Sequence, residues 1–390
     1  MTASPKTIFI PFLHAFGGVE RLALGLSRFL HEQGCAHSIV CFDQTIDLAS
    51  TADWPLQVRE LKPRRNPWAE SRSLAAYLRK EAAQGAPPAL IFDLNGAFYA
   101  GLLAPRGYVL HLTDPPSLLP SDVSKNALSL RKYRSTPRNR SRWMKSLHAE
   151  GVHRLNRRGV HKAAAVVVMT DVIADEISRL YQITAQIVRP GVAPQPKQAP
   201  RSLAMLGNGQ LRLLSVCRLE GNKRIDWILH ALAALDAETA EHPQNWELDV
   251  VGDGTQADFL RNLAQQLGLS QKVVFHGQVS DEKLREIYAD AHLFLMPAVQ
   301  GYGLPALEAL SAGLPVILHR ESGVAEILGD TPWAEVIDNA PNSLGLALNR
   351  MIDRLRDGSF KRLAPPEIPT ETEWARQICR ICGWIPPEPI

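Results

Sequence analysis

Two cations five residues apart stand between an apolar, strand-like run and a helix-like run. Arg218 and Lys223 lie in the segment RLEGNK, which follows LRLLSVC and precedes IDWILHALAAL. The first turn of a helix presents free N–H groups, and cations beside those groups bind a pyrophosphate. The spacing therefore predicts a diphosphate clamp at this turn.

A glycine-rich turn with a following acid supplies the second half of such a site. In the segment GYGLPALEALSAGLPVI, Gly301 and Gly303 precede an apolar helix in which Glu308 lies near the start. Glycines allow backbone N–H groups to approach a ligand closely, and a carboxylate accepts hydrogen bonds from hydroxyl groups. A diphosphate clamp together with a carboxylate for hydroxyls indicates a nucleotide-sugar site.

Short apolar strands alternate with amphipathic helices over nearly the whole length. This alternation predicts parallel sheets covered by helices on both faces. Distinctive residues recur after the predicted strands, at the edge where open parallel sheets bind ligands. They are Gly17, Gly18, Asn95, His111, Asp114, Arg218, Gly252, Gly254, Gly301 and Gly303. The strands are predicted at 7–13, 37–42, 89–93, 108–112 and 164–169, and then at 211–217, 247–251, 272–276, 292–296 and 315–318.

A proline-rich, polar segment divides the 390 residues. It predicts a linker at 196–205 between an N-terminal domain at 1–195 and a C-terminal domain at 206–366. We expect an α/β protein of two doubly wound, Rossmann-like domains facing each other across a cleft. A final helix within 367–390 is expected to pack back toward the N-terminal domain.

Composition is that of an ordinary globular protein, with 45% hydrophobic and 21% charged residues and a net charge of +3. Five scattered cysteines form no disulfide framework, which favours a reducing, cytoplasmic setting. The first apolar run is broken by Pro11 and His14, so no secretory leader is predicted. The longest apolar run, at 163–169, is too short to span a bilayer.

Positive charge is concentrated between Arg131 and Lys162, where eleven lysines or arginines accompany one acid, Glu150. Trp143, Met144 and Leu147 are interleaved with these cations, a pattern typical of a helix that lies on anionic lipid. The alternatives are a solvated basic helix face and, less favoured, a nucleic-acid surface. No nucleic-acid-binding signature accompanies the segment, so no nucleic acid is expected as a partner.

Five motifs in order resemble the retaining enzymes of glycosyltransferase family four, which have the two-domain GT-B fold. The motifs are GGVER, RLEGNK, VVGDG, the GYGLPALEALSAGLPVI block and the late Trp374. The resemblance is dense from 211 to 328 and diffuse at about 44–107 and 117–160. It implies a donor site made largely by the C-terminal domain.

The resemblance also implies roles for single residues. Arg218 and Lys223 match the pair that binds the donor diphosphate, and Glu308 matches the acid that binds the ribose hydroxyls. Gln300 stands where the family's Glu-x7-Glu motif has its first acid, and Tyr302 stands where Phe is usual. The implied catalytic residues are Arg218, Lys223, Gln300 and His111. The implied donor contacts are Gly17, Gly18, Gly252, Gly254, Gly277, Val279, Gly301, Tyr302, Gly303, Leu304 and Glu308, and Asn95 and Asp114 are the acceptor candidates.

The implied reaction is retaining transfer of a sugar from a UDP- or GDP-linked donor to a saccharide or lipid-linked acceptor. Such a role fits the synthesis of bacterial surface polysaccharide. No cofactor and no metal are expected, because no DxD-type motif is evident and Arg218 and Lys223 can replace a divalent ion. The alternatives are an epimerase or phosphorylase on the same fold, and a non-catalytic nucleotide-sugar-binding protein, since Gln300 replaces an acid.

Overall fold

The computed structural model describes residues 5–14, 16–118, 142–193, 210–238, 245–340 and 342–386, without the side chains of 118, 142–149 and 238. The chain divides into two compact units. The first comprises Met1–Pro190 with Thr370–Ile390, and the second comprises Gly191–Pro369. The predicted linker at 196–205 lies outside the described residues.

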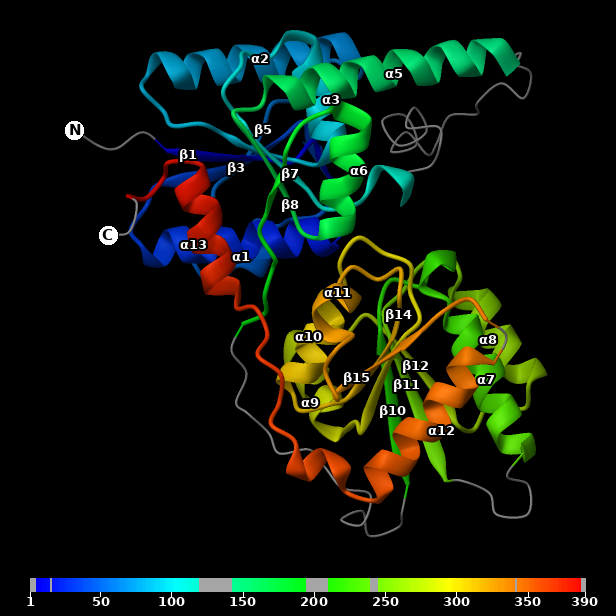
Figure 1. Ribbon diagram of the computed structural model, residues 1–390. Helices are drawn as coiled ribbons and strands as arrows, with labels where there is room; N and C mark the ends of the chain where they lie inside the picture. Colours follow the sequence, from blue (N-terminus) through cyan, green and yellow to red (C-terminus); the bar gives the residue numbers. More distant parts are fainter. Residues whose placement is uncertain are drawn as a thin grey trace. The chain divides into compact units, whose positions relative to one another are not determined.

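The first unit is built on a seven-stranded, all-parallel sheet with the order β5-β3-β1-β6-β7-β8-β9. Figure 1 shows its helices on either side of this sheet. The strands are β1 (Lys6–Phe9), β3 (His37–Cys41), β5 (Val58–Glu60), β6 (Leu90–Phe92), β7 (Val109–Leu112), β8 (Ala165–Val168) and β9 (Gln186–Ile187), with β2 (Phe12–Leu13) and β4 (Asp43–Gln44) forming a separate pair. The helices are α1 (Gly18–Glu32), α2 (Pro67–Ala83), α3 (Asp93–Leu103), α5 (Arg142–Lys162), α6 (Asp171–Tyr181) and α13 (Glu371–Ile381), with short 3-10 turns η1 (Ala49–Thr51) and η2 (Pro116–Leu118).

The second unit has a six-stranded, all-parallel sheet with the order β12-β11-β10-β13-β14-β15. Its strands are β10 (Leu211–Val216), β11 (Trp246–Val251), β12 (Val273–Gly277), β13 (Leu293–Met296), β14 (Val316–His319) and β15 (Ala334–Ile337). Its helices are α7 (Ile225–Glu238), α8 (Ala257–Gln266), α9 (Asp281–Asp290), α10 (Leu304–Ser311), α11 (Ala325–Leu328) and α12 (Ser343–Arg356), with the 3-10 turns η4 (Gly221–Lys223) and η5 (Ser359–Arg362). The predicted α/β class with parallel sheets in two domains is confirmed.

Both sheets reverse their strand order once, and this reversal determines where ligands bind. The chain moves outward from β1 through β3 to β5, then returns beside β1 with β6. In the second unit it moves from β10 to β12 and returns beside β10 with β13. At such a switch point the loops after the two central strands diverge and leave a crevice at the carboxyl edge. The segments that follow β1, β6, β10 and β13 are therefore the ones to inspect.

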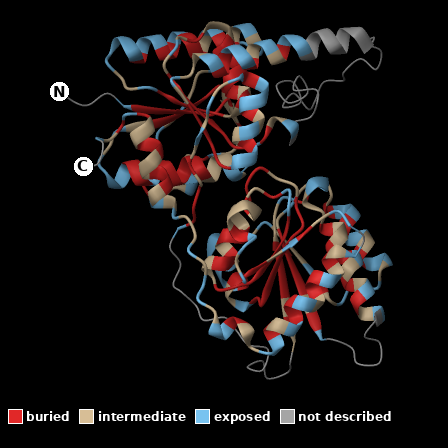
Figure 2. Ribbon diagram, in the orientation of Figure 1, coloured by how far each residue is buried: buried red, intermediate tan, exposed pale blue. Residues whose placement is uncertain are grey.

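Apolar burial holds each sheet between its helices. The strands β1, β6, β7, β13 and β14 are buried at every position, and Figure 2 shows both sheets as buried layers flanked by helices with exposed outer faces. Strands buried on both faces explain why the sequence reads as unbroken apolar runs rather than alternating ones. No described helix combines the length and the apolar character that crossing a bilayer requires.

The helix α13 belongs to the first unit although it follows the second in sequence. It packs against α1, where the Glu371 carboxylate lies against Gly25 and pairs with Arg28 at 3.7 Å. Trp374 is fully buried, and the Trp384 indole N–H donates to the Pro88 carbonyl at 2.8 Å. The Trp374 side chain thus completes a core that is otherwise made by the first half of the chain.

Candidate functional site

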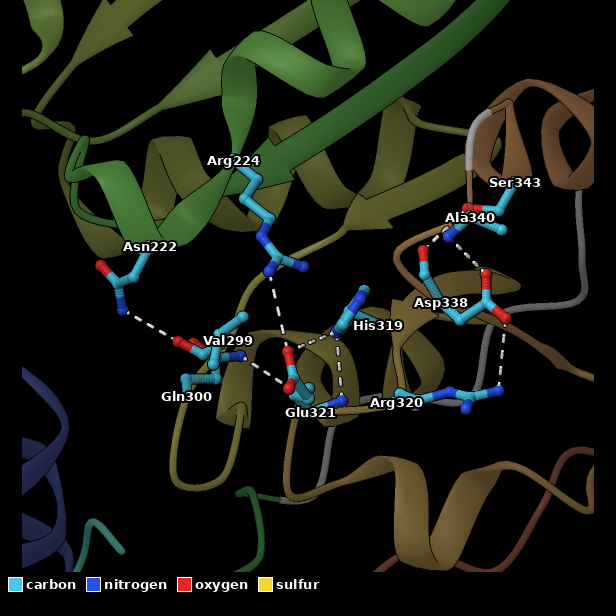
Figure 3. Close-up of polar contacts among 11 residues, drawn as sticks. Asn222, Arg224, Val299, Gln300, His319, Arg320, Glu321, Asp338, Ala340 and Ser343 are labelled. Atoms are coloured by element: carbon cyan, nitrogen blue, oxygen red, sulfur yellow. Dashed lines mark hydrogen bonds and ion pairs between the residues drawn. The ribbon is translucent and has the colours of Figure 1, made fainter. Parts of the chain in front are cut away.

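The loop after β10 carries the two predicted clamp cations in different settings. Arg218 is exposed, whereas Lys223 is partly buried at the end of η4. The loop is tied to the segment after β13 by two hydrogen bonds between Asn222 and Val299, both of 2.9 Å (Figure 3). Because β10 and β13 are adjacent, these bonds join the two loops that flank the switch point of the second unit. Lys223 lies at this switch point.

Lys223 donates to the side chain of Gln300 at this point. The ammonium Nζ lies 2.5 Å from Oε1 of the amide. The amide nitrogen Nε2 donates in turn to Met296 Sδ at 2.9 Å and to Ser322 Oγ at 3.2 Å. Contacts to three separate segments fix which way the amide points, with its oxygen toward Lys223. Sequence reasoning placed both residues in one site but did not identify Ser322 or Met296, which no motif marks.

The loop after β14 supports Gln300 through its main chain. Gln300 N–H donates to the Glu321 carbonyl at 3.2 Å, and Gly323 N–H donates to the Gln300 carbonyl at 3.2 Å. Ser322 Oγ, which accepts from the Gln300 amide, donates to the Tyr302 carbonyl at 2.9 Å. The segments after β13 and β14 therefore form one hydrogen-bonded unit around the Gln300 side chain.

Arg224 fastens the clamp loop to that unit (Figure 3). Its backbone has a φ of 54°, a left-handed conformation that costs a non-glycine residue about 1 kcal/mol or more. Its guanidinium lies 4.2 Å from the centre of the Trp227 ring and 3.7 Å from the Glu321 carboxylate. These contacts offset the backbone cost and hold the residue that follows Lys223 in one conformation.

His319, at the end of β14, lies beside this ion pair. Its side chain is fully buried, and burial, reinforced by the charge of Arg224, lowers its pKa. The neutral ring accepts a hydrogen bond at Nδ1 from Glu321 N–H at 3.1 Å. Because the histidine is neutral, the negative charge of the Glu321 carboxylate is paired with the positive charge of Arg224 (Figure 3).

The start of α10 shows why glycine is needed before the helix. Gly303 has a φ of 126°, and a Cβ there would lie 2.7 Å from Gln300 Nε2 and 3.0 Å from Ser322 Oγ. Leu304 begins the helix, and Gly301 and Tyr302 are both buried, Tyr302 to 5% exposure. Their main chains shape the turn. The Tyr302 ring was expected to contact the donor, but it is buried and is not exposed to a ligand.

Glu308 lies on α10 and is partly exposed. Its Oε2 accepts a hydrogen bond of 3.0 Å from the Tyr288 hydroxyl of α9. Tyr288 is itself buried, so its hydroxyl orients the carboxylate from the protein interior. A carboxylate held in this way is suited to accept hydrogen bonds from a diol, because its orientation is fixed before the ligand arrives.

Two of the predicted glycines, Gly252 and Gly254, lie against the clamp loop, and the third, Gly277, ends β12. A Cβ on Gly252, where φ is 124°, would lie 1.9 Å from the Cys217 carbonyl oxygen, and one on Gly254 would lie 2.5 Å from that of Leu219. Gly252 N–H donates to the Gly277 carbonyl at 2.8 Å. The two glycines thus let the chain around Arg218 approach β11, and Val279 beyond Gly277 is partly exposed.

In the first unit, the two predicted glycines after β1 lie at the start of a helix. Gly17 caps α1 and Gly18 is its first residue. The Glu20 carboxylate accepts a hydrogen bond from Gly17 N–H at 2.9 Å. The N–H group of this predicted donor contact is therefore bound by the chain's own carboxylate.

His111 does not lie where the sequence places it. Its side chain has no exposed surface, and its ring centre lies 5.1 Å from that of Phe92 and 5.8 Å from that of Trp374. Burial lowers its pKa to about 3, so the ring is neutral. A fully enclosed ring cannot touch a bound sugar, and the predicted contact is corrected to a role in the core beneath α13.

The acceptor candidates lie near an acid that sequence reasoning missed. Asn95, in the first turn of α3, is partly exposed, and Asp114 is exposed. Asp93, the first residue of α3, has a φ of 62°, and its Oδ1 accepts hydrogen bonds from Thr113 N–H at 3.2 Å and Thr113 Oγ1 at 2.5 Å. Desolvation, followed by the charge of Asp114, raises its pKa to about 7. The available signal was its position directly after an apolar strand.

The raised pKa of Asp93 predicts a pH dependence of stability. The unfolded carboxyl, with a pKa near 3.8, releases its proton first. The folded state therefore binds more protons between about pH 4 and pH 7, so the free energy of unfolding falls across this window and levels off above it. Asp93→Asn, which keeps the shape and tolerates the backbone conformation, should flatten this fall in urea unfolding from pH 4 to 8. Asp258→Asn, on a carboxylate that is 97% exposed, is the control, and an unchanged slope in Asp93→Asn would contradict the assignment.

Across the described residues, no three His, Cys, Asp or Glu side chains group closely enough to hold a metal ion. The observed polar groups are instead cations, amides and single carboxylates at the carboxyl edges of the two sheets. Within the second unit, the structure brings Lys223 and Gln300 together at one edge, with Gly303 directly beside Gln300.

Comparisons with known proteins match both halves of the chain to glycosyltransferase families. Residues 205–355 match the family described as glycosyl transferases group 1, and residues 16–195 match glycosyltransferase family 4. The O-antigen chain mannosyltransferase B of Escherichia coli is 30% identical over 250 residues, 58% of this chain and 59% of that protein. A GDP-mannose-dependent α-(1-6)-phosphatidylinositol monomannoside mannosyltransferase of Mycolicibacterium smegmatis is 32% identical over 156 residues, 37% of this chain and 40% of that one. The chain spans about half the length of the curated relatives it matches.

Solved structures cover nearly the whole chain. The lipopolysaccharide glycosyltransferase WaaG superimposes with a TM-score of 0.64 at 21% identity, over 97% of this chain and 95% of that one. Anabaena HepE in complex with UDP gives a TM-score of 0.65 at 15% identity, over 97% and 100%. These likenesses show the GT-B fold class. Two family matches in tandem span most of the sequence, and the chain belongs to the group 1 glycosyltransferases with a family 4 N-terminal region.

Proposed function

We propose that this protein transfers a sugar from a nucleoside diphosphate sugar to a hydroxyl group of a saccharide or lipid-linked acceptor. The observation that carries the proposal is the Lys223–Gln300 pair at the switch point of the second unit. An ammonium group held there by an amide is suited to meet the phosphates of a donor, and the exposed Arg218 can close on the same group.

The proposed chemistry is retaining and uses no metal. As the glycosidic bond breaks, negative charge develops on the departing diphosphate, and positioned cations stabilise that charge. Lys223 and Arg218 would supply the charge that a divalent ion supplies in other transferases. The departing phosphate oxygen would take the acceptor proton on the same face of the sugar, so no protein nucleophile is needed. Glu308, oriented by Tyr288, would bind the ribose hydroxyls.

The relatives support a UDP- or GDP-linked donor and a surface polysaccharide product. Mannosyltransferases of O-antigen and of a phosphatidylinositol mannoside are similar to this chain, and HepE has been solved with UDP-glucose. We therefore propose a lipid-linked or glycan acceptor at the cytoplasmic face of a membrane, near Asn95 and Asp114. Residues 131–162 would contact that membrane, although 131–141 and the side chains of 142–149 lie outside the described residues.

Thermal stabilisation by nucleotides tests the proposal directly. The purified protein is heated with UDP, GDP, ADP and their sugar conjugates, with EDTA and without added metal. We expect one diphosphate to raise the Tm, because it binds only the folded state, and its sugar conjugate to turn over when an acceptor is added. Release of free sugar without an acceptor would indicate an epimerase-like enzyme instead. Stabilisation without turnover on any acceptor would indicate a binding protein, and no stabilisation at all would overturn the donor site.

A further inference from the structure

The start of α2 and the loop before it carry a cationic surface around one exposed tryptophan. We name Lys62, Arg64, Arg65, Trp68 and Arg72 the α2 patch. Trp68 is 63% exposed, more than any other large hydrophobic residue among those described. Exposing an indole to water is unfavourable. Because single exposed hydrophobic residues are common on protein surfaces, the cations around Trp68 decide what this surface can bind.

Positive charge predominates on this surface. Six lysines or arginines occur from Leu61 to Lys80, and the one acid there, Glu70, is buried at 5% exposure. The side chains of Lys62 and Arg65 pair with Glu60 and Asp43 yet remain 75% and 82% exposed. Within the described residues, Arg64 and Arg72 form no ion pair. The α2 patch therefore presents net positive charge to the solvent.

The helix fixes this surface in place. Trp68, Arg72 and Arg79 are spaced four and seven residues apart, which puts them on one face of α2, and all three are exposed. Leu74 and Leu78 lie on the opposite face and are buried, as the alternation of exposed and buried segments along α2 in Figure 2 shows. Trp68 and Arg72 are thus presented by a rigid element rather than by a loop.

The location suits an enzyme whose acceptor lies in a bilayer. The loop from Lys62 follows the carboxyl end of β5, the strand at one side of the first sheet. Gly17, Asn95 and Asp114 come after the carboxyl ends of other parallel strands of this unit. They therefore lie at the same carboxyl edge of the sheet as the loop from Lys62. A surface bound at the α2 patch would therefore lie on the side of the unit that carries the acceptor candidates.

We propose that the α2 patch docks on an anionic lipid bilayer. A tryptophan ring prefers the headgroup level, where its apolar body leaves water and its N–H stays hydrated. Arginines beside it gain attraction from anionic headgroups of about 1 kcal/mol each, which is about fivefold in the binding constant. A soluble acidic partner would use the cations but would have no need of the exposed indole. The surface is separate from residues 131–162, and it stands without the transferase activity.

Vesicle co-sedimentation of the full chain tests this inference. Binding is measured on phosphatidylcholine vesicles with and without phosphatidylglycerol, for the wild type, Trp68→Ala and the double variant Arg64→Gln/Arg72→Gln. We expect the double variant to bind anionic vesicles roughly 25-fold more weakly, and Trp68→Ala to bind more weakly on the same vesicles. The matched control is Phe259→Ala/Arg285→Gln, which removes an exposed aromatic and an exposed cation from the second unit and should bind as the wild type does.

A second readout separates the α2 patch from the other basic segment. Brominated lipids quench tryptophans that enter the bilayer, so the fraction of tryptophan fluorescence that is quenched should be smaller in Trp68→Phe than in the wild type. The same measurement on Trp143→Phe reports the segment 131–162. The proposal would be overturned if all the α2 variants bound vesicles and were quenched as the wild type is. It would also be overturned if these variants lost binding to a soluble polyanion while their binding to vesicles stayed intact. Turnover on a soluble acceptor should be unchanged in these variants, so failure here leaves the proposed reaction standing.

Discussion

Replacing Lys223 with alanine is expected to lower kcat/KM by about 10²- to 10³-fold, the range found when one positioned donor to a developing charge is removed. Lys223 donates to Gln300 at the switch point of the second sheet. Its loss would remove a cation from the leaving diphosphate while deleting no core contact, since the side chain is only partly buried. Initial rates with the donor identified by thermal stabilisation measure the effect, and the Tm should change little.

Two further variants make this expectation specific. Lys283→Ala removes an exposed cation of α9 that pairs with Glu286 at 3.0 Å, and should leave kcat/KM unchanged. Gln300→Leu keeps the ammonium but removes the oxygen that holds it, and should give a loss between that of the control and that of Lys223→Ala. Near-wild-type rates in Lys223→Ala would contradict the clamp assignment, whatever the other variants do.

Replacing Gly252 with alanine is expected to destabilise the second unit by about 3 kcal/mol or more. The new Cβ would lie 1.9 Å from the Cys217 carbonyl oxygen, a main-chain atom between β10 and the clamp loop. The backbone φ of 124° adds strain for any side chain. Relief would require β10 and β11 to separate at their carboxyl ends, so the clamp loop should be displaced as well. Urea unfolding followed by circular dichroism measures the change.

Gly221 provides the matched control for that substitution. It lies in the same loop, and a Cβ there would meet nothing within 4 Å. Gly221→Ala should therefore change the free energy of unfolding by about 0.5 kcal/mol or less. Equal stability of the two variants would show that the chain around Cys217 relaxes without cost, and that Gly252 is not required for packing.

Much of the fold follows from patterns that depend only on neighbouring residues. Buried parallel strands are apolar along their whole length, so the predicted strands at 37–42 and 211–217 correspond to β3 and β10. The predicted strand at 7–13 is interrupted in the structure at Ile10 and Pro11, because proline has no N–H for the ladder. The strands β5, β9 and β15 were missed, since strands at or near a sheet edge need no apolar run.

The site was less accessible to sequence reasoning, because its contacts depend on strand order. Lys223 and Gln300 are far apart in sequence and meet because β13 pairs with β10. The raised pKa of Asp93 depends first on its burial and then on Asp114 in another loop, and the ring of His111 packs against Trp374 of α13. Residue type and spacing identified the clamp, but not which side chains would be enclosed.

The placement of α13 bears on the order in which the chain can fold as it is synthesised. The second unit is continuous from Gly191 to Pro369, so all of its strands are synthesised before α13 is. The first unit lacks Trp374 until that moment, and its core around His111 stays open. Domains generally fold as units during synthesis. The half of the protein made first is therefore the half completed last, and it depends on chaperones or its own partial stability in the interval.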